Sequence, residues 1–245
     1  MRIAFSGTAN TGKSTLLRDF LTVWQMYTTP EETYRDVIKR SKLTHSKGAT
    51  KEGQEEILNF IVNSMKGKTP EDNIAYDRCA LDNVVYSMWA YDKGIGGIDE
   101  AFISKCIATV RESIKDLDII FWVPYNENIR IQNDDLRETD LDFIKEIDNI
   151  FAVIYNQYIL GGNFPLFDRE DMPAIIPVLA TERHNRLVEI ANYVNLDGNS
   201  INPDEQWINE YIKTADQDSG AKESVETLLK QQKEEAFARD GTIIV

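Results

Sequence analysis

The chain has 245 residues, of which 42% are hydrophobic, and a formal net charge of −14. This length suits one large domain, or one domain with an appendage, and the apolar content is enough for a sizeable core. The negative charge disfavours a broad basic surface for duplex DNA, because phosphate contacts require clustered Lys and Arg.

Cysteine usage and hydropathy exclude two further classes. The two cysteines, Cys79 and Cys106, are too few for a disulfide framework and lack the spacing of a metal site. No signal peptide is expected, and no apolar run reaches the ~20 residues that span a bilayer. We therefore expect a cytoplasmic protein without a membrane partner.

Strand and helix patterns alternate through the first 194 residues. Buried strands are expected at 1–6, 73–77, 118–123 and 174–178, with 25–28 as a further candidate. Helices are expected at 13–24, from a Thr-Pro-Glu-Glu start at 29–32, and at 52–66, 80–93, 99–116, 140–159 and 182–194. Because this alternation requires crossover connections, we predict an α/β fold with a five-stranded parallel sheet and helices on both faces.

Residues 195–245 lack the alternation. We predict that they form an acidic helical C-terminal appendage to a domain of residues 1–194, with helices near 203–214 and 222–238. Two interpretations are open for this appendage. It is either a solvated helical tail or an arm for homodimerisation or for another partner.

A phosphate-binding loop follows the first strand. Its pattern is G-x-x-x-x-G-K-[ST], between the strand and the amphipathic helix that a P-loop NTPase fold requires. Gly7 and Gly12 let consecutive backbone N–H groups turn toward a phosphate, and the helix start adds its positive dipole end. Lys13 is expected to reach the β- and γ-phosphates as a catalytic group, and Ser14 to bind Mg²⁺. We assign ATP binding to Gly7, Thr8, Ala9, Asn10, Thr11, Gly12, Lys13, Ser14 and Thr15.

An acid and a base end the strand at 73–77. In ATPase motors the acid on the magnesium side closes a long apolar strand, but the apolar strand here ends in Val123 and Pro124. Asp77 is therefore the candidate for the catalytic acid and second magnesium ligand. Arg78 is the candidate for a catalytic group that grips acceptor phosphate or polarises the transfer. The alternative is a capping Asp followed by a surface Arg.

A polar stretch before the helix at 140–159 is expected to form a lid. An Arg in such a lid neutralises charge on the transferring phosphoryl group, and closure of the lid excludes water. Arg137 is our first candidate for this catalytic role and Arg130 the second. The alternative is a charged surface loop with Thr139 or Asp140 as the cap of the next helix.

Segments 77–87 and 134–140 carry a resemblance to known proteins. They read Asp-Arg-Cys-Ala-Leu-Asp-Asn-Val-Val-Tyr-Ser and Asp-Asp-Leu-Arg-Glu-Thr-Asp. They resemble the P-loop kinase family that contains nicotinamide riboside kinase domains and many phage AAA-domain kinases. They are similar, more loosely, to thymidylate and other nucleoside monophosphate kinases, although Cys79 replaces the aromatic residue of thymidylate kinases. The resemblance covers residues 1–194 and implies a kinase of nucleotide metabolism, in the host cytoplasm if the chain is phage-encoded.

The pocket for the phosphoryl acceptor is expected on two helices. Glu31, Tyr34 and Arg35 have the i, i+3, i+4 spacing of one helix face, where a carboxylate could hold a sugar hydroxyl and Tyr34 could stack on a base. Asp82, Asn83 and Tyr86 follow the Asp-Arg pair and are expected to face the same cavity. The alternative for the first helix is an exposed, capped helix with a Glu–Arg pair.

These assignments predict an ATP- and Mg²⁺-dependent kinase that acts on a nucleoside or nucleoside monophosphate. Arg183 follows the last strand, where such kinases contact adenine, and is a further ATP-binding candidate. The first alternative is a phage-type kinase that phosphorylates a modified base in DNA, such as 5-hydroxymethyldeoxyuridine, or a polynucleotide end. The second alternative is a nucleotide-dependent switch or assembly ATPase.

Overall fold

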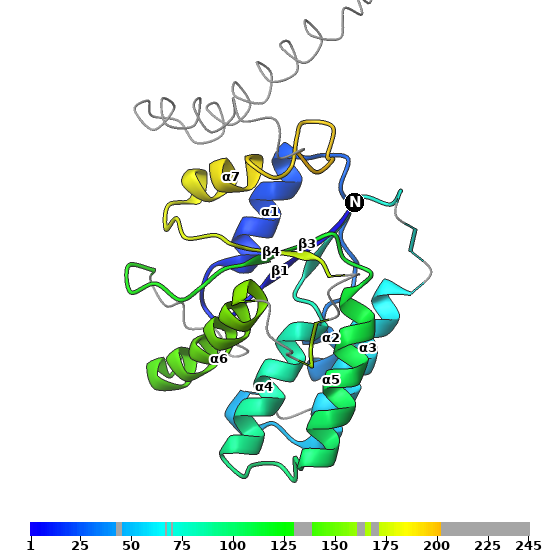
Figure 1. Cartoon of the computed structure of the whole chain (residues 1–245), viewed down its shortest axis with the longest axis vertical. Coiled ribbons are helices and arrows are strands. Elements are labelled where there is room, and N and C mark those ends of the chain that lie inside the picture. The colour runs from blue at the N-terminus through cyan, green and yellow to red at the C-terminus, as the bar shows by residue number, and fades with distance from the viewer. Residues whose placement is uncertain are drawn as a thin grey trace, which may run out of the picture.

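The computed structural model describes residues 1–42, 46–66, 68–69, 71–129, 139–160, 165–167 and 172–201. Within these residues the chain forms a four-stranded parallel sheet in the order β2-β1-β3-β4 (Figure 1). The strands are β1 (Arg2–Ser6), β2 (Ile74–Asp77), β3 (Ile119–Trp122) and β4 (Ala174–Pro177). The predicted α/β class is confirmed, with four strands in place of five.

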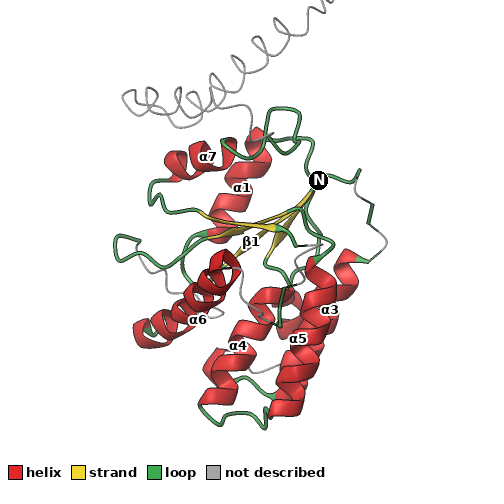
Figure 2. Ribbon diagram, viewed as in Figure 1, coloured by secondary structure: helices red, strands yellow, loops and turns green. Residues whose placement is uncertain are grey.

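Helices cover both faces of the sheet (Figure 2). On one side lie α1 (Lys13–Val23) and α7 (Arg183–Ala191). The other side carries α2 (Tyr34–Ser41), the short 3₁₀ helix η1 (Ser46–Gly48), α3 (Lys51–Met65), α4 (Ala80–Asp92), α5 (Glu100–Ile114) and α6 (Leu141–Leu160). The prediction of a sheet enclosed between helices is therefore confirmed.

Alternate strand residues supply the two halves of the core. In β3, Ile119 and Phe121 pack with the apolar residues of α1 and α7, whereas Ile120 and Trp122 pack with those of α3 to α6. This division follows from the two-residue period of a strand. Phe5 of β1 stacks on Phe121, with ring centroids 5.6 Å apart, and joins the two central strands.

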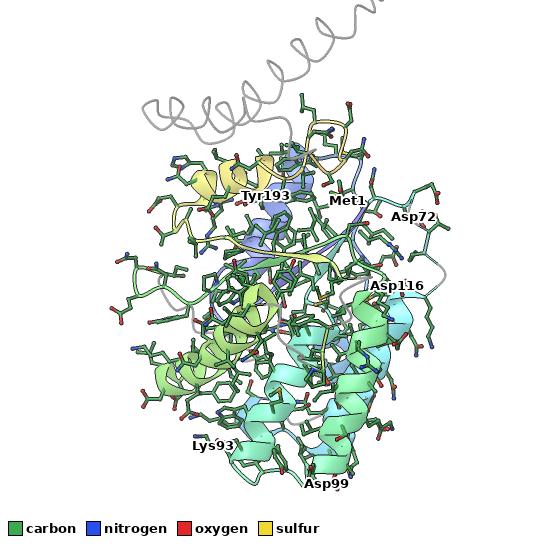
Figure 3. All side chains as sticks on the ribbon, viewed as in Figure 1. Met1, Asp72, Lys93, Asp99, Asp116 and Tyr193 are labelled. Carbon is green, nitrogen blue, oxygen red and sulfur yellow. The ribbon has the colours of Figure 1, made fainter. Side chains whose placement is uncertain are left out.

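Parallel pairing brings distant segments to the carboxyl edge of the sheet. In register, Phe5 pairs with Asp77, and Ser6 pairs with Trp122. The loop after β1 therefore lies between the ends of β2 and β3, which is the usual place for a ligand in an open α/β sheet. In Figure 3 the labelled residues that precede β1, β2 and β3 gather on one side of the molecule: Met1, Asp72 and Asp116.

Residues 25–28 were expected as a fifth strand, and this expectation is wrong. Thr28 forms a single parallel bridge to Ile74 at the edge of the sheet. The Trp24 N–H instead bonds the Phe20 carbonyl, and the Tyr27 N–H bonds the Trp24 carbonyl. The three aromatic side chains pack together, with centroids 4.6 Å apart for Phe20 and Trp24. This packing holds the backbone in a turn up to Tyr27, so only Thr28 pairs with the edge of the sheet.

The helix expected from Thr29 starts later. In the structure α2 begins at Tyr34, with Thr33 as its N-cap. The Thr33 N–H donates a 2.8 Å hydrogen bond to the Asp36 carboxylate, which is the reciprocal half of a capping box. This cap defines the helix start more strongly than the Pro30 pattern does, and it leaves Glu31 in the preceding loop.

Residues 195–201 pack on the α/β domain. Trp24 Nε1 donates a 2.8 Å hydrogen bond to the Asn195 carbonyl, and the Tyr27 hydroxyl donates one of 2.7 Å to the Gly198 carbonyl. The two helices predicted at 203–214 and 222–238 lie outside the described residues. Among the helices of the described part of the chain, none is long and apolar enough to cross a membrane.

Candidate active site

The loop between β1 and α1 has the geometry of a phosphate-binding loop. Gly7 and Gly12 have φ angles of 137° and 85°, values that favour glycine. A Cβ atom on Gly7 would lie 2.5 Å from the Val123 carbonyl oxygen, so this glycine also permits the close approach of β3. The loop therefore passes against the end of the neighbouring strand before it enters α1.

Lys13, the first residue of α1, is buried at this loop. Its ammonium donates hydrogen bonds to the Thr8 carbonyl oxygen and to Thr11 Oγ1, the latter 3.2 Å away. Burial lowers the pKa of Lys13 well below its ordinary value, and the positive charge of Arg78 acts in the same direction. A bound phosphate would oppose both effects, because its negative charge favours the protonated amine.

Ser14 and Asp77 meet across the carboxyl edge of the sheet. Ser14 Oγ donates a 2.9 Å hydrogen bond to Asp77 Oδ2. Arg35 Nη1 of α2 lies 3.3 Å from the same carboxylate oxygen. Asp77 Oδ1 is buried and has no hydrogen-bond partner among the described residues. The pair thus presents hard oxygen atoms, one of them unpartnered, which is the donor type that Mg²⁺ prefers.

Arg78 is held in a fixed position beside the loop. It has a φ angle of 81°, which is uncommon for a residue with a side chain. Its Nη1 donates hydrogen bonds to Asp82 Oδ1 at 2.7 Å and to the Gly7 carbonyl at 3.0 Å. The guanidinium carbon lies 5.1 Å from the Tyr34 ring centroid and 5.3 Å from that of Tyr86. These contacts bring Arg78, Tyr34 and Tyr86 together at the predicted acceptor pocket.

Asp82 joins the start of α4 to the phosphate loop. Its carboxylate accepts hydrogen bonds from Ser6 Oγ at 2.5 Å and from the Gly7 N–H at 3.1 Å. It also accepts from the Cys79 N–H at 3.1 Å and pairs with Arg78. The side chain is 3% exposed. Asp82 was predicted to bind substrate, but its observed contacts are those of a residue that orders the loop and Arg78.

A cavity extends from the phosphate loop between α2, α3 and α4. Six predicted residues line it besides the loop itself: Tyr34, Arg35, Arg78, Asp82, Asn83 and Tyr86. Sequence reasoning missed five others: Ile38, Ser46, Gln54, Ile57 and Ile61. One sequence signal could have identified Gln54 as a cavity residue. It is a single glutamine on the apolar stripe of the helix at 52–66, three residues before Ile57 and seven before Ile61.

Gln54 and Asn83 form a buried amide pair in this cavity. Asn83 Nδ2 donates to Gln54 Oε1 at 2.8 Å and to the Gln54 carbonyl at 3.0 Å. Both partners are acceptors, so the Asn83 amide can sit only with its nitrogen toward Gln54. Asn83 Oδ1 is consequently the outward atom, and it is buried without a hydrogen-bond partner among the described residues. Such an atom favours a ligand with an N–H or O–H donor.

Glu31 and Arg183 lie apart from this cavity. Glu31 is exposed in the loop before α2, so it does not share a helix face with Tyr34 and Arg35. The Arg183 side chain is 70% exposed and forms an ion pair with Asp19 of α1. The lid candidates Arg137 and Arg130 lie outside the described residues.

A second arginine of α7, which sequence reasoning missed, contacts the phosphate loop. Arg186 Nη1 donates a 2.8 Å hydrogen bond to the Thr11 carbonyl, and Nε donates one of 2.8 Å to the Ala180 carbonyl. Arg186 is 6% exposed. It lies three residues after Arg183, at helical spacing, but nothing in the pattern distinguishes the buried arginine from the exposed one.

Comparison with known proteins places this geometry in a family. A family model described as "AAA domain" matches residues 2–161, which is more than half of the chain. The matched segment includes the phosphate loop, Asp77, Arg78 and the cavity residues of α2, α3 and α4. A search of the curated proteins finds no match.

Several solved structures have a similar fold. A deoxyadenosine kinase from M. mycoides superposes with a TM-score of 0.56 at 17% identity, covering 78% of this chain and 97% of that chain. The NadR protein in complex with NR superposes with a TM-score of 0.53 at 16% sequence identity, covering 78% of this chain and 50% of that chain. Thymidylate kinase from Candida albicans superposes with a TM-score of 0.54 at 14% sequence identity, covering 78% of this chain and 90% of that chain. At these identities the likeness shows the fold, and it confirms the predicted P-loop kinase architecture.

Proposed function

The chain belongs to the AAA-domain family, and from this premise we propose that it transfers the γ-phosphoryl group of ATP to a nucleoside or nucleoside monophosphate. One observation carries the proposal. Ser14 lines the cavity of α2, α3 and α4 together with the rest of the phosphate loop, and it is hydrogen-bonded at 2.9 Å to Asp77 at the end of β2. This arrangement provides for a donor nucleotide on one side and an acceptor on the other.

On the ATP side, the N–H groups of the loop and the start of α1 would bind the β-phosphate. Lys13 would reach the β- and γ-phosphates, and it would exchange its bond to the Thr8 carbonyl for phosphate oxygen. Ser14 and Asp77 would hold Mg²⁺, which neutralises phosphate charge when bound. Arg35, 3.3 Å from Asp77, supplies the positive charge at this carboxylate in the structure.

On the acceptor side, the cavity combines apolar and polar walls. Ile57 and Ile61 of α3 can contact a flat ring, and the Tyr34 ring offers a stacking surface. Asn83 Oδ1, which has no partner among the described residues, could accept a hydrogen bond from the N–H of a nucleobase. Arg78, fixed next to Tyr34, could bind either the transferring group or the phosphate of a monophosphate acceptor.

Catalysis would then rest on position and charge. Asp77 is suited to orient the acceptor hydroxyl or to accept its proton, since one carboxylate oxygen has no partner in the described residues. Lys13 and Arg78 would stabilise the charge that spreads over the phosphoryl oxygens. We propose Arg137 as a third cation, supplied by a lid that closes over both substrates.

The test is phosphoryl transfer from radiolabelled ATP to separate pools of nucleosides, nucleoside monophosphates and DNA that contains 5-hydroxymethyldeoxyuridine. We expect a labelled small-molecule product with Mg²⁺ and none with the Lys13→Ala variant. Label in DNA alone would support the polymer kinase. ATP hydrolysis without transfer to any pool would support the switch ATPase and contradict the proposal.

A further inference from the structure

Arg186 is a buried cation that forms no direct salt bridge with the described residues. Its guanidinium makes its hydrogen bonds to two backbone carbonyls, those of Thr11 and Ala180. Among the described residues no carboxylate lies within ion-pairing distance of it. The charge of Glu189 acts on it only from a longer distance. Burying a guanidinium without a direct carboxylate contact costs free energy, so the two carbonyl contacts are expected to have a purpose beyond packing.

The contact with Thr11 sets the orientation of one peptide group of the phosphate loop. In a trans peptide the carbonyl of one residue and the N–H of the next point in opposite directions, and no cis peptide occurs in the described residues. Arg186 draws the Thr11 carbonyl toward α7. The Gly12 N–H must then point away from α7, and Gly12 lines the cavity at the phosphate loop.

The absence of a side chain on Gly12 makes this contact possible. A Cβ atom on Gly12 would lie 2.8 Å from Arg186 Nη1. The guanidinium therefore occupies the space that any other residue at position 12 would need. Gly12 thus has two constraints, a φ angle of 85° and the close approach of Arg186.

The second contact ties the loop to the segment after β4. The Ala180 carbonyl accepts from Arg186 Nε at 2.8 Å, and the Ala180 N–H donates to both carboxylate oxygens of Glu189 at 3.1 Å. Both sides of the Ala180 backbone are therefore held by α7. Through Arg186, this anchored segment supports the phosphate loop from outside the cavity.

We propose that Arg186 is a positioning residue that fixes the Thr11–Gly12 peptide with its N–H toward the β-phosphate of the bound nucleotide. This inference rests on the proposed ATP-binding function. Without Arg186 the Thr11 carbonyl is free to rotate inward, where its partial negative charge repels phosphate. The effect should therefore depend on the presence of a β-phosphate.

The test compares nucleotide affinities by isothermal titration calorimetry for the parent, Arg186→Gln and Arg186→Lys. ATP affinity of Arg186→Gln should fall about 10- to 100-fold, as expected for the loss of a charge-assisted hydrogen bond. AMP affinity should change less than about threefold, because AMP lacks the β-phosphate. The affinity for tripolyphosphate should fall in parallel with the affinity for ATP. Arg186→Lys should recover part of the loss, since an ammonium cannot span both carbonyls.

Arg18, exposed on α1, provides the matched control as Arg18→Gln, which should bind like the parent. Parent-like ATP affinity in Arg186→Gln, or equal losses of ATP and AMP affinity, would overturn the inference. If Arg186→Gln does not fold, Arg186→Lys is decisive: selective loss of ATP affinity supports the role, and parent-like affinity refutes it. A parent protein that binds no ATP would refute the proposed function instead.

Discussion

Ser14 Oγ donates a 2.9 Å hydrogen bond to Asp77 Oδ2, although 63 residues separate the two in the sequence. The contact exists because β1 and β2 are adjacent and parallel, so the loop after one strand meets the residue that ends the other. It joins a hydroxyl that lines the cavity of α2, α3 and α4 to the carboxylate at the end of β2.

Asp77→Asn should lower kcat by about 10²- to 10³-fold, because in the proposed mechanism the variant loses the charge that would hold Mg²⁺ and orient the acceptor hydroxyl. The Mg²⁺ concentration for half-maximal rate should rise as well. Steady-state kinetics over a range of Mg²⁺ concentrations measures both. Asp116→Asn, at a half-exposed acid that precedes β3, is the control and should behave like the parent. Near-normal turnover of Asp77→Asn would return Asp77 to a structural role.

Asn83→Ala should weaken acceptor binding and leave ATP binding intact, because Asn83 lies in the cavity wall and its amide bonds Gln54. Loss of a hydrogen bond to an uncharged donor predicts an increase of about 3- to 10-fold in the KM for the acceptor. Titration with ATP alone should show an unchanged Kd. Asn63→Ala, on the exposed face of α3, is the control. An effect on the ATP Kd alone would contradict this placement of the acceptor.

Asp82→Ala should destabilise the fold by about 3–5 kcal/mol, because it leaves the buried Arg78 charge without its partner. The Gly7 N–H and the Ser6 hydroxyl lose an acceptor in the same change. Chemical denaturation measures the free energy of unfolding. Asp92→Ala, at the exposed end of α4, should change it by less than about 0.5 kcal/mol. A similarly small effect of Asp82→Ala would show that the ion pair contributes little.

The free energy of unfolding should decrease as the pH rises above about 9. Burial raises the pKa of Cys79 from 9.0 to about 12 and that of Cys106 from 9.0 to about 11. Unfolded thiols lose their protons near pH 9, whereas the folded thiols keep theirs, so alkaline pH favours the unfolded chain. Denaturation at pH 8 and pH 10 should show a larger loss for the parent than for the Cys79→Ala, Cys106→Ala double variant. An equal loss in both proteins would assign the pH dependence to other groups.

Local patterns were sufficient for the elements and for the phosphate loop. The phosphate loop belongs to one strand–loop–helix unit. The relative positions of Gly7, Gly12, Lys13 and Ser14 therefore follow from short-range geometry. The predicted and observed ends of the helices agree within about three residues wherever an apolar stripe extends along the whole helix. The start of α2 was misplaced because two capping patterns compete there, and only the Thr33–Asp36 bonds decide between them.

The partners of each functional side chain depended on the tertiary structure. The sequence by itself determined that Asp77 ends a strand beside a phosphate loop, but the packing of α2 decided that Arg35, and not Glu31, reaches it. Likewise, the sequence shows Gln54 and Arg186 as ordinary helical residues. Each becomes specific only when two helices, or a helix and a loop, bring polar groups together out of water. A buried polar atom must be satisfied by whatever lies next to it in space, and sequence spacing carries no information about that neighbour.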